Sequence, residues 1–93
     1  MIEAQFREFL GNDPGITSKD IAVRSRVAKA EKAEEILCRS LDEIVANDDL
    51  MYDSLVALQA HEDPKHNPMQ NAVRKYYIFK NGRAFPQLRY YKR

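Results

Sequence analysis

The stretch Asn71–Phe85, with the sequence NAVRKYYIFKNGRAF, contains four aromatic rings and four positive charges but no acidic residue. Lysine and arginine side chains neutralise phosphates, and aromatic rings can stack on nucleic-acid bases. Rings at helical spacing are also typical of the buried face of a helix, so their placement has to separate the two roles.

Helical geometry separates the rings from the charges. At about 100° per residue, one stripe of a helix through this stretch carries apolar and aromatic side chains, which are Met69, Ala72, Val73 and Tyr76, with Tyr77 and Phe79 beside it. Arg74 and Lys75 point away from that stripe. We therefore expect Tyr76 and Phe79 in the core, Tyr77 at the boundary with an exposed hydroxyl, and the two basic side chains at the surface.

Charge is divided unevenly along the chain. Residues 64–93 carry eight Lys and Arg residues and no acidic residue, whereas residues 1–63 carry seven and all fourteen acidic residues. The overall charge of +1 therefore conceals a C-terminal third of +8 and a remainder of −7. This asymmetry indicates a polyanionic partner. Pairing of the basic third with the acidic body of the same chain explains it equally well.

A second set of positive charges lies in the first half of the chain. Arg26, Lys29 and Lys32 step by three along an expected helix, and Arg24 lies nearby. A run of this kind is usually a solvated helix face, and contact with a ligand is the less common alternative.

The other reactive side chains do not form a recognisable catalytic or metal site. His61 and His66 flank a loop at a separation that matches no common ligand pattern. Cys38 is expected to be a buried small hydrophobe at a helix end. Asp48 and Asp49 are explained by the dipole of the helix that they begin. We therefore expect no enzymatic activity, no cofactor, no metal and no small-molecule substrate.

Length and composition indicate a single helical domain over residues 1–93, with residues 82–93 as a docked tail. One cysteine cannot form an intrachain disulfide, which favours a reducing cytoplasmic location. No apolar run approaches the ~20 residues that a membrane span requires, so no membrane contact is expected.

The predicted fold is all-α: a small orthogonal bundle of four main helices, a short helix and an extended C-terminal tail. The main helices are expected at about residues 2–10, 18–38, 49–61 and 68–80, and the short one near residues 41–46. Side-chain N-caps suggest the helix starts, with candidates Thr17 or Ser18, Ser40 (with Glu43), Asn47 or Asp48, and Asn67. Pro68 suits the first position of the last helix, and Gly82 suits its left-handed end.

Three segments of these helices follow a known pattern. They are FREFL in the first helix, TSKDIAVRSRV at the start of the long helix, and NAVRKYYIFKNG in the last helix. Their order resembles the SAM-like N-terminal (core-binding) domain of tyrosine recombinases and phage integrases, over about residues 2–82. Ser18 corresponds to the cap of the long helix, and the closing helix matches at Ala72, Val73, Arg74, Tyr76 and Tyr77.

The resemblance implies a helical bundle that grips duplex DNA, with basic side chains contacting the backbone. By position, these side chains are Arg24 and Arg26 on the long helix and Arg74 and Lys75 on the closing helix. The recombinase catalytic domain, with its Arg, His and Tyr nucleophile set, is not part of this sequence, so we expect no strand cleavage.

Charge and resemblance together predict a non-catalytic nucleic-acid-binding module, with duplex DNA as the expected partner. The candidate binding residues are Arg24, Arg26, Lys29, Arg74, Lys75, Lys80 and Arg83. The alternative is a protein–protein interaction or homo-oligomerisation domain of a bacterial protein. In that case the basic third would dock on the acidic surface of a partner or of a second copy.

Overall fold

The computed structural model describes residues 1–15 and 19–92 and confirms the predicted all-α bundle. Its helices are α1 (Glu3–Gly11), α2 (Lys19–Leu37), α3 (Leu41–Val45), α4 (Asp48–Gln59) and α5 (Pro68–Asn81), followed by a 3-10 turn at Leu88–Tyr90. Each predicted helix is present, and its ends differ from the prediction by at most two residues. The expected caps Thr17 and Ser18 lie outside the described residues.

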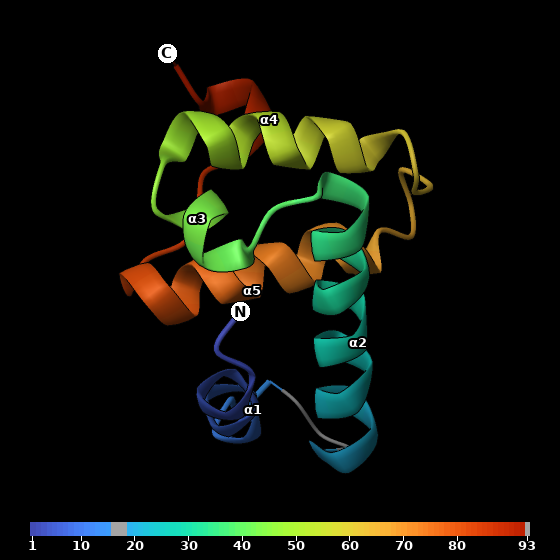
Figure 1. Cartoon of the computed structure of the whole chain (residues 1–93), viewed down its shortest axis with the longest axis vertical. Coiled ribbons are helices and arrows are strands. Elements are labelled where there is room, and N and C mark those ends of the chain that lie inside the picture. Colours follow the sequence, from blue (N-terminus) through green and yellow to red (C-terminus); the bar gives the residue numbers. More distant parts are fainter. Residues whose placement is uncertain (16–18, 93) are drawn as a thin grey trace.

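The long helices of the bundle cross one another. Figure 1 shows α4 and α5 running across the direction of α2, with α3 between α4 and α5 and with α1 at the far end of α2. The long helix α2 packs chiefly against α5 and α1. Its inward face carries the buried side chains of Val27, Ala30 and Ala33. Two of these are methyl groups, which allow the crossing helices to approach closely.

Aromatic rings join α1 to α5. The Phe6 ring meets the Tyr76 ring edge-on, with 4.9 Å between centroids, and Phe79 lies 5.7 Å from Phe6 and 5.3 Å from Phe9. Tyr76 is fully buried and Phe79 packs against the core half-buried, so the prediction that both rings belong to the core holds. Such ring pairs add stability beyond the area that they bury.

The C-terminal tail is docked by rings as well. Phe85 is only 4% exposed and lies 5.2 Å from the Tyr77 ring and 5.1 Å from the Tyr91 ring. Tyr91 in turn stacks on Tyr52 of α4 at 5.4 Å. The described part of the tail therefore lies along α5 and α4.

Helix ends follow the predicted signals at three places. The Ser40 hydroxyl accepts a hydrogen bond from the Glu43 amide at 3.2 Å, and the Asn47 side chain accepts one from the Leu50 amide at 3.0 Å. Gly82 ends α5 with a φ of 73°, in the left-handed region that favours glycine.

The start of α5 differs from the prediction. Asn67 makes no side-chain cap; its amide nitrogen donates to the Pro64 carbonyl instead. The Glu62 carboxylate accepts hydrogen bonds from the Met69 and Gln70 amides at 2.6 and 3.0 Å. A carboxylate complements the positive end of the helix dipole better than a neutral amide. This accounts for a cap provided by Glu62 instead of Asn67.

Two further side chains correct the sequence-based expectations. Cys38 is exposed, because it follows the last residue of α2 with a φ of 54° and its side chain lies outside the core. The Tyr77 residue is fully buried, and its hydroxyl donates to Asp48 at 2.7 Å instead of meeting solvent. A carboxylate partner for this hydroxyl could not be expected from the spacing along α5 alone.

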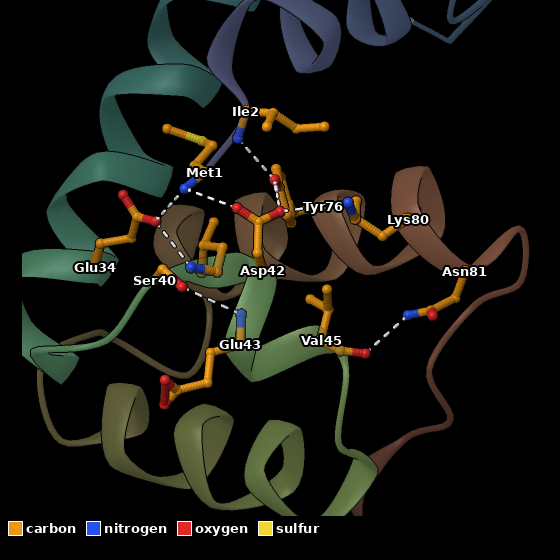
Figure 2. A network of polar contacts seen from close by, with 11 residues as sticks. Met1, Ile2, Glu34, Ser40, Asp42, Glu43, Val45, Tyr76, Lys80 and Asn81 are labelled. Atoms are coloured by element: carbon orange, nitrogen blue, oxygen red, sulfur yellow. Dashed lines mark hydrogen bonds and ion pairs between the residues drawn. The ribbon is translucent and has the colours of Figure 1, made fainter.

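A cluster of charged groups lies where α1, α2, α3 and α5 meet (Figure 2). The Met1 ammonium group lies 3.0 Å from Glu34 and 3.1 Å from Asp42. The Tyr76 hydroxyl donates to Asp42 and accepts from the Ile2 amide at 2.9 Å. Glu34 also accepts from the Leu41 amide at 2.8 Å, which holds the start of α3 against α2. Charge-assisted hydrogen bonds of this kind are stronger than neutral ones.

The Tyr76→Phe substitution tests the cluster. It leaves the ring in place but removes the donor to Asp42 and the acceptor for the Ile2 amide. We expect the free energy of unfolding in urea to fall by about 2 kcal/mol. Tyr91→Phe is the matched control, because that hydroxyl donates to the exposed Asp49, and its loss should stay below about 1 kcal/mol. Equal losses would contradict the assigned role of the cluster.

The same cluster should make stability depend on pH at both ends of the range. Burial opposes ionisation of Asp42, but hydrogen bonds from Tyr76 and the Met1 ammonium outweigh it and lower its pKa below 3.8. Burial likewise opposes the Met1 ammonium, yet Glu34 and Asp42 raise its pKa above 8.0. The Asp42 contribution is present above pH 3.8 and lost as the pH falls through the folded value. The Met1 contribution is complete below pH 8.0 and lost as the pH rises through the folded value.

Urea unfolding measured at a series of pH values checks this dependence. Wild-type stability should decline on both the acid side and the alkaline side. Asp42→Asn should lower stability near neutral pH and flatten both declines, because one side chain takes part in each. A variant whose profile is merely shifted downward, with unchanged shape, would show that Asp42 is not responsible.

Candidate nucleic-acid interface

Three of the predicted binding residues in the C-terminal third have carboxylate partners. Lys75 lies 2.6 Å from Asp13, Lys80 lies 3.5 Å from Asp42, and Arg83 lies 3.4 Å from Asp48. The hydrogen bond from Lys75 is also the main reason why the pKa of Asp13 is lowered. The basic third is therefore partly neutralised by the acidic body, which was one of the two explanations of the charge asymmetry.

Arg74 serves a different purpose. One terminal nitrogen of its guanidinium group donates to the carbonyl oxygens of Phe85 and Pro86, at 2.9 and 3.2 Å. Burial lowers the pKa of this group below its usual value, and the side chain is half-buried instead of pointing outward as expected. Arg74 thus fastens the tail to α5 and keeps its charge without an acidic partner in the part of the chain that the structure describes.

The three candidates on α2 occupy two different places. Arg24 is exposed and shares a hollow with Arg7 and Asp20 on the side of α1. Arg26, half-buried, and Lys29, exposed, face the start of α5. Arg26 lies near enough to Asp13 to make a small contribution to its lowered pKa.

Two adjoining hollows bring together cations from three parts of the chain. The first, about 250 Å³, lies between α2 and the start of α5 and is lined by Ala22, Ser25, Arg26, Lys29, Pro68 and Asn71. The second, about 460 Å³, lies between α5, the end of α4 and the tail. Its lining consists of Gln59, Asn67, Gln70, Asn71, Arg74, Gln87, Leu88 and Arg89. Asn71 belongs to both, and we call these two linings together the α2–α5 face.

The α2–α5 face combines positive charge with amide groups. Its cations are Arg26, Lys29, Arg74 and Arg89, and none of the described residues that line it is acidic. At one edge it borders on Glu62, whose carboxylate is occupied by the first amides of α5. The start of α5 is therefore already capped. Guanidinium and ammonium groups can bind phosphates here, and amides can bond to phosphates or to base edges.

Arg89 is a member of this face that was not among the predicted residues. It follows Pro86 in the tail, where it donates to the Gln87 side chain at 3.1 Å and packs 4.9 Å from the Tyr90 ring centre. Its position depends on how the tail docks on Tyr77 and Tyr52, and no local sequence pattern predicts that docking. The only feature of the sequence that pointed to Arg89 was its place in the basic third.

Other candidate chemistry gives no assembled site. His61 and His66 are both exposed in the loop before α5. Over residues 1–15 and 19–92, no three His, Cys, Asp or Glu side chains gather as metal ligands would. In the same residues, no helix has the length and apolar character needed to cross a membrane.

Comparisons with protein-family models, curated proteins and solved structures find no match for this chain. The similarity to a recombinase core-binding domain therefore stays a prediction.

Removing the Arg74 guanidinium should loosen the tail. In Arg74→Ala the carbonyls of Phe85 and Pro86 lose their donor, and the amides of Tyr90 and Tyr91, bonded within the 3-10 turn, should exchange with solvent faster. We expect about a tenfold increase, the equivalent of ~1.4 kcal/mol, measured by hydrogen exchange with NMR detection. Arg74→Lys, which retains one donor group, should show a smaller effect. Unchanged exchange in Arg74→Ala would contradict this role.

Proposed function

We propose that this chain is a non-catalytic nucleic-acid-binding module that holds duplex DNA by its phosphates at the α2–α5 face. The observation that carries the proposal is the gathering of Arg26, Lys29, Arg74 and Arg89 around two adjoining hollows without an acidic lining residue among those described. The sequence resemblance to a recombinase core-binding domain supports the same function.

The proposed phosphate contacts are made by cations that do not already contact a carboxylate. A cation that already contacts a carboxylate gains less from a phosphate, because that contact has to be given up or shared. Lys75, Lys80 and Arg83 are in this position. The proposed phosphate contacts are therefore Arg26, Lys29, Arg74 and Arg89, and not all the basic residues of the last third.

The number of phosphate contacts sets how steeply the affinity for DNA should fall with salt concentration. Each phosphate contact contributes about −0.9 to the slope of log affinity against log salt concentration. Four contacts give a slope of about −3.6, which is about a 100-fold loss of affinity between 50 and 200 mM salt. Binding of this kind is largely independent of base sequence.

A pair of double variants with equal charge tests the location. Fluorescence anisotropy with a labelled duplex of about 20 base pairs should show the salt slope of the wild type reduced by about 1.8 in Arg26→Ala/Lys29→Ala. Lys80→Ala/Arg83→Ala is the matched control: it also removes two positive charges, but from residues paired with Asp42 and Asp48. We expect its slope to stay close to that of the wild type.

Two results would contradict the proposal. No binding at low salt would exclude duplex DNA as the partner, and equal slopes for the two double variants would indicate a bulk charge effect. If binding is absent, the molar mass measured by light scattering at low and high salt shows whether the chain self-associates. A dimer that dissociates in salt would favour the protein-interaction alternative.

A further inference from the structure

Asn71 lies at the centre of the α2–α5 face. It is exposed on α5 and lines both hollows, with Arg26 and Lys29 in one and Arg74 and Arg89 in the other. Asn67, Asn71 and Arg74 follow each other at steps of four and three, which places them along one side of the helix. A polar side chain thus sits between two pairs of positive charges.

The Asn71 amide is not used by the fold. No hydrogen bond joins its side chain to another described residue. The neighbouring amides are engaged: Asn67 donates to Pro64, Gln70 donates to Glu62, and the Gln87 oxygen accepts from Arg89. Gln59 is also without such a bond, but it lies at the end of α4 and lines only the second of the two hollows. Asn71 therefore offers a donor and an acceptor together in the middle of the face.

A donor and an acceptor side by side match a base edge better than a phosphate. Phosphate oxygens only accept hydrogen bonds, so an amide oxygen has no partner there. In the major groove of DNA, adenine presents the N7 acceptor beside the N6 donor, and an asparagine amide can bond to both at once. Arg26 and Lys29 lie on one side of Asn71, and Arg74 and Arg89 lie on the other. These cations could contact the two backbones that border the groove, which is about 12 Å wide.

We propose that Asn71 recognises an adenine in the major groove, so that the module prefers duplexes with an A·T pair at one position. This inference rests on the proposed function and adds base recognition to phosphate binding. It assigns different roles to neighbouring residues: the four cations hold the duplex, and Asn71 selects the site.

Selection from a randomised duplex pool identifies any preferred position. Wild-type protein should enrich adenine at one position of the bound duplexes. Exchange of that A·T pair for G·C should weaken binding about tenfold, and replacement of the adenine by 7-deazaadenine, which lacks the N7 acceptor, should weaken it in the same direction. Asn71→Ala should bind all three duplexes equally, with the salt slope of the wild type. Gln5→Ala removes an exposed amide of α1 that lines neither hollow, so it is the control variant and should keep the preference.

The outcomes separate the inference from the proposed function. Salt-dependent binding without a preferred base, or a preference that persists in Asn71→Ala, would overturn the role of Asn71 and leave phosphate binding intact. Absence of salt-dependent binding would overturn both. Because Asn71 is exposed and makes no contact that the fold requires, Asn71→Ala should unfold in urea like the wild type, which excludes misfolding as the cause of a lost preference.

Discussion

The contact of the Met1 ammonium group with Glu34 and Asp42 is the interaction on which the arrangement of the helices depends (Figure 2). Through Tyr76 it ties α5 to the groups contributed by α1, α2 and α3. A shift of any one helix would leave half-buried charges without their partners, which costs free energy beyond the loosened apolar contacts. The cluster therefore supports the crossing of α2 and α5, on which the α2–α5 face also depends.

The positive charges of the chain divide into two groups by their surroundings. Lys75, Lys80 and Arg83 balance carboxylates of the acidic body, so three of the eight positive charges in the last third contribute to the fold. Arg74 and Arg89 are positioned by the docked tail, beside cations that α2 supplies from the first half of the chain. The proposed interface thus depends on tertiary structure more than on the basic composition of one segment.

Local signals were sufficient to predict the helices. Ser40, Pro68 and Gly82 mark helix ends through interactions within a few residues, and the apolar stripes of α2 and α5 follow from helical spacing. Contacts between distant segments could not be predicted from such local signals. The partner of the Tyr77 hydroxyl, the cap that Glu62 provides and the place of Arg89 on the face all depend on how loops and tail return to the bundle. Of the candidate site, sequence identified Arg26, Lys29 and Arg74 but did not show that they adjoin each other.

The most direct test of a binding face on α2 and α5 is a titration of the ¹⁵N-labelled chain with duplex DNA, followed by amide chemical shifts. We expect the largest changes in residues 25–29, 67–74 and 87–89, which contain most of the residues that line the two hollows. Changes centred on Lys80 and Arg83, or on the outer side of α4, would contradict it. So would a spectrum that the duplex leaves unchanged at low salt.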